Sequence, residues 1–311
     1  NWSEEACEKL GIPVDIFPPA YSPVEVAGEV TAEASKETGL AEGTPVIVGT
    51  GDGAMSSLGA GMVEEGDGMI YYGTAGLFNV LDQDLEKRLT GVWEFRIGEY
   101  GSAYMLTSGE ALRWFRDRLG FQELEAERHL GLSAYHLLDE EAEKIPPGSE
   151  GVIVLPYFMG QRSPEFDPSA RAVIFGLSIS HTRVHIYRAL LESFGYGVYH
   201  GLLTGRKKPK RILATGGGAK SPLWRQIVSD IINLRQEYIA KADAPLGDAY
   251  FAGYGIGIFK DFKTMKNQWV KVTAITEPRI DVHEKYLKFF EVYKGLHVLK
   301  DQFKVLEKAV G

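Results

Sequence analysis

Apolar and polar residues alternate along this chain in a pattern typical of strand, turn and helix units. Short apolar runs that predict strands end in glycine-rich turns within residues 45–53, 69–76 and 211–218. Helices are predicted where apolar residues recur about every four positions, most clearly in the segment that follows residues 180–182. Alternating strands and helices predict an α/β fold.

The same pattern predicts several other elements. Residues 45–48 have the composition of a buried strand, and residues 93–97 also read as a strand. Prolines divide the first 45 residues into helical pieces and loops, and Ser3 is placed to cap the first helix. A helix rich in Tyr, Phe and Lys is predicted to close the chain over residues 281–306.

Composition narrows the class of protein. The chain has 311 residues, of which 44% are apolar and 24% charged, as in ordinary globular proteins. Its net charge of −8 argues against a surface for nucleic acid or anionic membranes, which would need a basic stripe. One cysteine excludes an intrachain disulfide, and no apolar run reaches the about 18 residues that cross a bilayer. We therefore expect a cytoplasmic protein and, because the chain begins at Asn1, interpret it as a fragment.

The turn at residues 49–53 places one carboxylate, that of Asp52, between glycines where a strand passes into a helix. A carboxylate with so little steric cover is suited to act as a general base or a metal ligand. An aspartate there is also typical of a helix N-cap, and the residues alone favour the cap. Both interpretations stay open at this point.

The two later turns differ in how strongly they indicate a ligand. Residues 73–76 are ordinary for a hairpin loop. Residues 216–218 are consecutive glycines, which indicate either a tight turn or close approach of the backbone to a ligand. Neither a Walker A loop nor a complete dinucleotide fingerprint is present. The seven histidines lack the spacing of a metal cluster.

Considered in order, these turns resemble the FGGY family of carbohydrate kinases. The similar motifs lie at residues 43–64, 72–76, 108–114, 155–183, 215–224 and 246–249. Each motif is weak alone, whereas the combination is specific and extends over most of the chain.

The resemblance implies the two-lobed actin/hexokinase-like fold, which is related to that of ribonuclease H. We expect residues 1–66 to be the C-terminal tail of the N-terminal, sugar-binding lobe. Residues 67–311 would then be the C-terminal, nucleotide-binding lobe. The family's Asp-x-Gly-Thr phosphate loop and much of its sugar site belong to a part of the first lobe that is not in this chain.

The resemblance also implies roles for individual residues. Asp52 matches the catalytic aspartate, which accepts a proton from the sugar hydroxyl as general base. The first three of the matched nucleotide-binding residues would contact phosphates, and the last three would line the adenosine pocket. These residues are Gly73, Thr74, Gly109, Gly217, Gly218 and Ser221. The implied cofactors are ATP and Mg²⁺, and no protein metal ligand is assigned.

The implied reaction is ATP-dependent phosphorylation of a sugar or polyol. Residues 155–183 are closest to the xylulose-kinase-like branch, so a ketopentose such as xylulose is expected, with ribulose, gluconate, glycerol and erythritol as alternatives. Gly53 disfavours glycerol, because glycerol-using relatives usually carry glutamine there, and Ala75 replaces a usual serine. Other hypotheses are a nucleotide-binding fragment without catalysis and an actin-like assembly protein. The expected partners are the sugar and ATP, without nucleic acid or membrane, and a homodimer is left open.

Overall fold

The computed structural model describes residues 2–81, 104–163, 165–205, 207–242 and 244–310. A six-stranded sheet lies at its centre. In chain order its strands are β3 (Asp67–Tyr72), β4 (Ala75–Val80), β5 (Tyr104–Thr107), β8 (Arg211–Thr215), β9 (Gln236–Tyr238) and β10 (Ala274–Thr276). Their order in space is β10-β9-β8-β3-β4-β5. The strand expected at residues 93–97 lies outside the described residues.

The direction of the strands decides which turns meet. β8 pairs in parallel with both β3 and β9, whereas β4 and β10 are antiparallel to their neighbours. Tyr71 pairs with Thr215, so the carboxyl ends of β3 and β8 lie side by side. In open α/β sheets, ligands bind outside the carboxyl ends of parallel strands.

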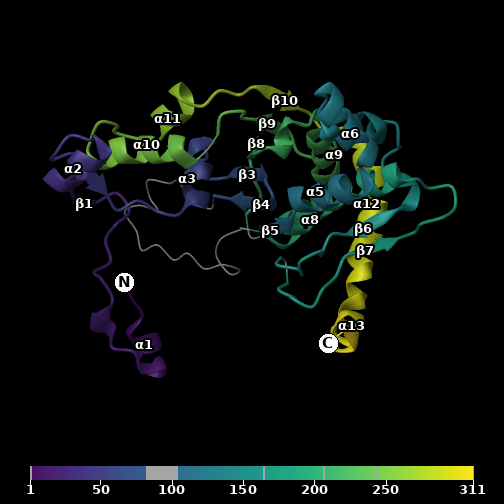
Figure 1. The fold of residues 1–311 in the computed structure, drawn as a ribbon, viewed down its shortest axis with the longest axis horizontal. Helices are drawn as coiled ribbons and strands as arrows, with labels where there is room; N and C mark the ends of the chain where they lie inside the picture. The colour runs from purple at the N-terminus through teal and green to yellow at the C-terminus, as the bar shows by residue number, and fades with distance from the viewer. Residues whose placement is uncertain (1, 82–103, 164, 206, 243, 311) are drawn as a thin grey trace.

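Helices on one side of the sheet build the main hydrophobic core. They are α5 (Gly109–Leu119), α6 (Phe121–Leu130), α7 (Ala134–Glu143), α8 (Arg183–Thr204), α9 (Pro222–Ile232) and α12 (Ile280–Gly295). α8 contacts β4, β5, α5 and α9, and Figure 1 shows these helices gathered together. Leu190, Phe194 and Val198 of α8 are at most 3% exposed, which confirms the helical apolar stripe predicted after residues 180–182.

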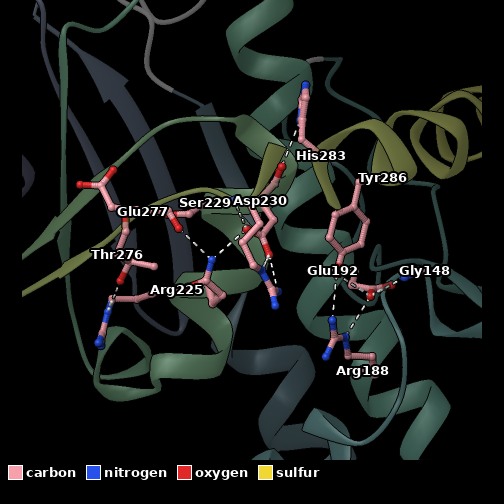
Figure 2. A network of polar contacts seen from close by, with 12 residues as sticks. Gly148, Arg188, Glu192, Arg225, Ser229, Asp230, Thr276, Glu277, His283 and Tyr286 are labelled. Atoms are coloured by element: carbon pink, nitrogen blue, oxygen red, sulfur yellow. Dashed lines mark hydrogen bonds and ion pairs between the residues drawn. The ribbon is translucent and has the colours of Figure 1, made fainter. Parts of the chain in front are cut away.

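Two buried carboxylates fasten α12 to α8 and α9 (Figure 2). Glu192 of α8 is 1% exposed and accepts hydrogen bonds from Arg188 and from the Tyr286 hydroxyl of α12, both at 2.9 Å. Asp230 of α9 is 0% exposed and pairs with Arg279, just before α12, at 2.6 Å. Because a buried charge is stable only when it is paired and hydrogen-bonded, these contacts hold the three helices in one arrangement.

The residues before the central sheet form a smaller group together with helices from later in the chain (Figure 1). Its elements are β1 (Val26–Glu29), α2 (Ala32–Thr38), β2 (Pro45–Ile47), α3 (Asp52–Gly59), α10 (Ala244–Gly255) and α11 (Lys263–Gln268), whereas α1 (Glu4–Leu10) lies apart from them and is followed by η1 (Val14–Ile16). α3 packs on α10 through Met55, Leu58, Tyr250 and Phe251. The Ser3 hydroxyl accepts the Ala6 N–H at 3.2 Å, which confirms the predicted cap of α1.

Two sequence-based expectations were wrong. The segment at residues 45–48 is not buried, since Val46 and Val48 are 46% and 40% exposed. The reason is that β1 and β2 pair only with each other among the described residues. The closing helix is not continuous, because α12 ends at Gly295 and η4 (Leu296–Leu299) leads into α13 (Lys300–Val310). A further ribbon that had not been predicted as a pair joins β6 (Ile153–Leu155) to β7 (Val173–Phe175).

The contact between α3 and α10 depends on Gly247. A Cβ atom there would lie 2.1 Å from the backbone oxygen of Met55. We expect Gly247→Ala to lower the free energy of unfolding by about 1–3 kcal/mol, because the helices must move apart. Urea denaturation followed by circular dichroism measures this change.

The matched control is Gly295→Ala, at the end of α12, where a Cβ atom meets nothing within 4 Å. It should leave stability unchanged or raise it by up to about 1 kcal/mol, as alanine does in a helix. Equal effects of the two substitutions would contradict the close packing of α3 on α10.

Candidate functional site

The sheet brings two of the glycine-rich turns together at its carboxyl edge. Gly73 and Thr74 connect β3 to β4, and residues 216–218 follow β8, which is paired with β3. The backbones approach so closely that a Cβ atom on Gly216 or Gly218 would lie 2.9 or 3.1 Å from the Tyr72 carbonyl oxygen. Gly216 also has φ +93°, a conformation that side chains rarely allow. Glycine is therefore required here by the fold itself.

The start of α5 joins the same edge. The Gly109 N–H donates to the Gly73 carbonyl at 2.9 Å, and the Glu110 N–H donates to the Thr74 carbonyl at 3.0 Å. A Cβ atom on Gly109 would lie 2.7 Å from the Gly73 carbonyl oxygen, so only glycine permits this approach. The expected phosphate-contacting residues Gly73, Thr74 and Gly109 thus form one continuous surface.

Gly217 differs from its neighbours, because the fold does not require glycine there. Its φ of −61° and ψ of −41° suit any residue, and a Cβ atom would meet nothing within 4 Å. The N–H groups of Gly217 and Gly218 have no backbone acceptor among the described residues. Adjacent free N–H groups beside open space form a typical concavity for an anion.

Ser221 has a structural role at the start of α9. Its hydroxyl accepts the Trp224 N–H at 3.0 Å and caps the helix, and Pro222 occupies the first helical position. The carboxyl group of Asp139 on α7 lies near the same hydroxyl, which lowers the pKa of that carboxyl group in part. Ser221 is therefore held in place beside the glycine turn as the cap of α9.

Sequence reasoning missed Asp139, which lies in a polar helix without a recognisable motif. Burial raises the pKa of its carboxyl group above the ordinary value, although hydrogen bonds from Ser221 and Tyr187 lower it in part. The Tyr187 hydroxyl of α8 donates to Asp139 at 3.0 Å. Asp139 thus connects α7 to α8 and lies near Ser221 at the start of α9.

Asp52 is the first residue of α3, and its N-cap is Gly51. The cap interpretation that the sequence alone favoured is therefore wrong, because the residue lies one position inside the helix. Its exposed carboxylate accepts the N–H of Gly53 at 2.7 Å. Within the described ranges, no hydrogen bond or ion pair joins Asp52 to the glycine turns. The structure places it on the smaller group of elements, held by the contact of α3 with α10.

A pocket beyond the start of α9 does not coincide with these residues. It has a volume of ≈ 390 Å³ and lies between Pro146, Pro222, Gln226 and Arg279. The described part of the chain contains no group of three or more His, Cys, Asp or Glu side chains arranged to hold a metal ion. None of its helices combines the length and the apolar composition that a membrane crossing requires.

The chain matches both sequence models of one family. Residues 68–256 match the FGGY family of carbohydrate kinases, C-terminal domain, and residues 1–59 match the N-terminal domain of that family. The match to the N-terminal domain precedes the match to the C-terminal domain along the chain.

Individual relatives give the same picture. Xylulose kinase of Bacillus subtilis is 29% identical over 306 residues, which cover 96% of this chain and 59% of the relative. Gluconokinase of the same species is 31% identical over 74% of this chain and 47% of its own length. The crystal structure of xylulose kinase from Rhodospirillum rubrum is 30% identical, with a TM-score of 0.79 over 97% of this chain and 60% of that one.

The chain thus spans 59–60% of the length of these two xylulose kinases. The structural likeness confirms the expected actin/hexokinase-like α/β fold.

The environment of Asp139 predicts a pH dependence of stability. Its pKa is raised above 3.8 in the folded chain, so the native state binds this proton more tightly than the unfolded chain does. The free energy of unfolding should therefore fall as pH rises from the unfolded to the native pKa. Asp139→Asn, which cannot ionise, should reduce this fall. Urea midpoints measured between about pH 4 and pH 7 test it.

Glu140→Gln is the matched control, because this neighbouring carboxylate on α7 is exposed. It should follow the pH profile of the unsubstituted chain. A profile for Asp139→Asn that also matches the unsubstituted chain would contradict the burial and pairing assigned to Asp139.

Proposed function

Because this chain belongs to the FGGY family of carbohydrate kinases, we propose that it transfers the γ-phosphoryl group of ATP to a hydroxyl group of a sugar. The observation that supports a phosphate site most directly is the convergence of Gly73, Thr74, Gly109 and Gly217 at the carboxyl edge of the sheet. Backbone N–H groups and glycines in such a place allow a polyphosphate to approach the main chain closely.

Each glycine-rich segment has its own task in this proposal. Gly73, Thr74 and Gly109 contact the phosphates, and the exposed Thr74 hydroxyl is free to donate to a phosphate oxygen. Gly217, Gly218 and Ser221 line the adenosine pocket. Mg²⁺ accompanies the phosphates of ATP and neutralises part of their charge. The open space above Gly217 fits a bound nucleotide, because a ligand can occupy it without displacing a side chain.

We assign the general base to Asp52. Phosphoryl transfer from ATP to an alcohol needs a carboxylate within about 3 Å of the attacking hydroxyl. Asp52 stands at the start of α3 and makes only one hydrogen bond, to the N–H of Gly53, within the described part of the chain. Its carboxylate is therefore available to accept the proton of a sugar. Most of the acceleration comes from positioning and from stabilisation of charge.

The proposed substrate is a ketopentose such as xylulose. Xylulose kinases from several bacteria align with 96% of this chain. Gluconokinase is also among the relatives, so gluconate is the first alternative, and ribulose, glycerol and erythritol remain further candidates. The proposed partners are thus a sugar and ATP, and a homodimer is compatible with them.

We also divide the chain into two lobes at residues 66 and 67. Residues 1–66 belong to the sugar-binding lobe, and residues 67–311 form the nucleotide-binding lobe. The second candidate function is nucleotide binding without phosphoryl transfer. It is favoured by the position of Asp52, since no hydrogen bond within the described ranges joins this residue to the glycine turns.

Gly217 allows nucleotide binding to be tested separately from folding. We expect Gly217→Ala to leave the unfolding midpoint unchanged, because its Cβ atom enters open space. The same atom should weaken MgADP binding about tenfold, or about 1.4 kcal/mol, by obstructing the ligand. Isothermal titration calorimetry measures this, and Gly295→Ala on α12 is the control. Undiminished binding by Gly217→Ala would place the nucleotide elsewhere.

Sugar-dependent release of ADP distinguishes the two candidate functions. We expect release with xylulose, and a decrease in kcat of about 10²–10⁴-fold in Asp52→Asn, the usual contribution of a general base. The control is Glu33→Gln, which removes an exposed carboxylate from the first turn of α2. MgADP binding without any sugar-dependent release would favour the nucleotide-binding alternative. Full activity of Asp52→Asn would contradict the assignment of the base.

A further inference from the structure

Arg225 is a buried cation directly behind the glycine turn. It lies on α9, one turn after Ser221, and is 6% exposed. One end of its guanidinium donates to the carbonyl of Ala219, which belongs to η3 (Gly218–Lys220). The positive charge is thus attached to the segment that we assign to the adenosine pocket.

Among the described residues, none of the groups that this guanidinium contacts carries a negative charge. Besides Ala219, it contacts the hydroxyl of Thr276 at 3.4 Å and lies over the ring of Tyr238 at 4.6 Å. Within the described ranges, no carboxylate forms an ion pair with Arg225. Figure 2 shows Arg225 beside Thr276, at some distance from Arg188 and its partner Glu192.

The arginines that pair with buried carboxylates in this lobe are different. Arg188 pairs with Glu192 at 2.9 Å, and Arg279 pairs with Asp230 at 2.6 Å. Hydrogen bonding to Asp230 raises the pKa of Arg279, whereas burial lowers the pKa of Arg225. An arginine remains protonated even so. Arg225 therefore keeps a charge that the surrounding protein does not balance.

An unbalanced charge in the interior is costly, so its presence calls for a compensating anion. The edge of the sheet next to it offers free N–H groups at Gly217 and Gly218 and open space above Gly217. The N–H groups and the open space both favour an anionic ligand, as does the buried positive charge. The aromatic ring of Tyr238 and the Ala219 carbonyl stabilise the guanidinium until an anion is bound.

We propose that Arg225 is a positioning residue whose buried charge, behind the turn that lines the adenosine pocket, raises the affinity of the whole nucleotide site for a ligand with negatively charged phosphates. It acts from behind the turn, by its charge and by fixing Ala219, and does not itself contact the ligand. The inference rests on the proposed nucleotide site. It adds that the site selects a nucleoside diphosphate or triphosphate over the uncharged nucleoside through this one buried charge.

The experiment compares a charged and an uncharged ligand. ADP and adenosine are titrated against the chain and its Arg225→Met and Arg225→Lys variants by calorimetry, each at fixed ionic strength. Arg225→Met removes the charge but keeps most of the volume, and Arg225→Lys keeps the charge. Lys208→Gln is the control for net charge, since this lysine is exposed and precedes β8 at the opposite end of that strand.

Arg225→Met should weaken ADP binding at least about tenfold, or about 1.4 kcal/mol, and change adenosine binding by less than about twofold. Arg225→Lys should retain more ADP binding than Arg225→Met does, because it keeps the positive charge. The urea midpoint of unliganded Arg225→Met should not fall, because replacing a buried charge by an apolar side chain of similar volume is often neutral or stabilising.

Other outcomes would overturn the inference. Equal weakening of ADP and adenosine, or a variant that fails to fold, would mean that Arg225 only supports the turn. Unchanged ADP binding in Arg225→Met would exclude any contribution of its charge, and an equal loss in Lys208→Gln would assign the effect to net charge. Absence of ADP binding by the unsubstituted chain would overturn the proposed function itself. That result is distinguishable, because it appears before any substitution is made.

Discussion

The parallel pairing of β3 with β8 is the constraint on which the rest of the site depends. The register of Tyr71 with Thr215 ends the two strands at one level. As a result, two chain segments that are more than a hundred residues apart in sequence turn away from the sheet next to each other. Neighbouring strands lie about 4.8 Å apart, so the main chains of the two turns come close to each other. Glycine at positions 216 and 218 is explained by close contacts, because a Cβ atom on Gly216 would lie 2.9 Å from the Tyr72 carbonyl oxygen and one on Gly218 would lie 2.3 Å from the Trp224 ring.

The same constraint separates glycines that the fold needs from one that it does not. Gly109, Gly216 and Gly218 are each closely approached by backbone atoms, so their lack of a side chain has a structural explanation. Gly217 faces open space with ordinary backbone angles. A residue of any type could stand there in the empty chain, and glycine carries an entropic cost when it is ordered. Space for a ligand, as in the proposed nucleotide site, gives a physical reason for glycine at this position.

Local sequence patterns could predict the parts of the fold that depend on neighbouring residues. The stripe of α8, the cap at Ser3 and the strands that lead into the glycine turns all follow from short-range periodicity and turn chemistry. The exposure of Val46 could not be predicted, because composition does not tell whether a strand has neighbours on both sides. Asp139 and Arg225 were missed for a related reason. Their significance comes from residues far along the chain, such as Ser221, Tyr187 and Thr276.

The buried charges of this lobe have two different explanations. Glu192 and Asp230 each have an arginine partner within 3 Å, and each holds α12 in place. The cost of burying these two carboxylates is therefore offset by ion pairs within the folded chain. Removing either partner would leave a buried charge alone, which is strongly destabilising. Arg225 has no such partner among the described residues, although its guanidinium is equally withdrawn from water. Pairing within the protein therefore accounts for the first two and not for the third. The charge of Arg225 is neutralised only when an anionic ligand binds. Its electrostatic energy therefore contributes to ligand binding and not to folding.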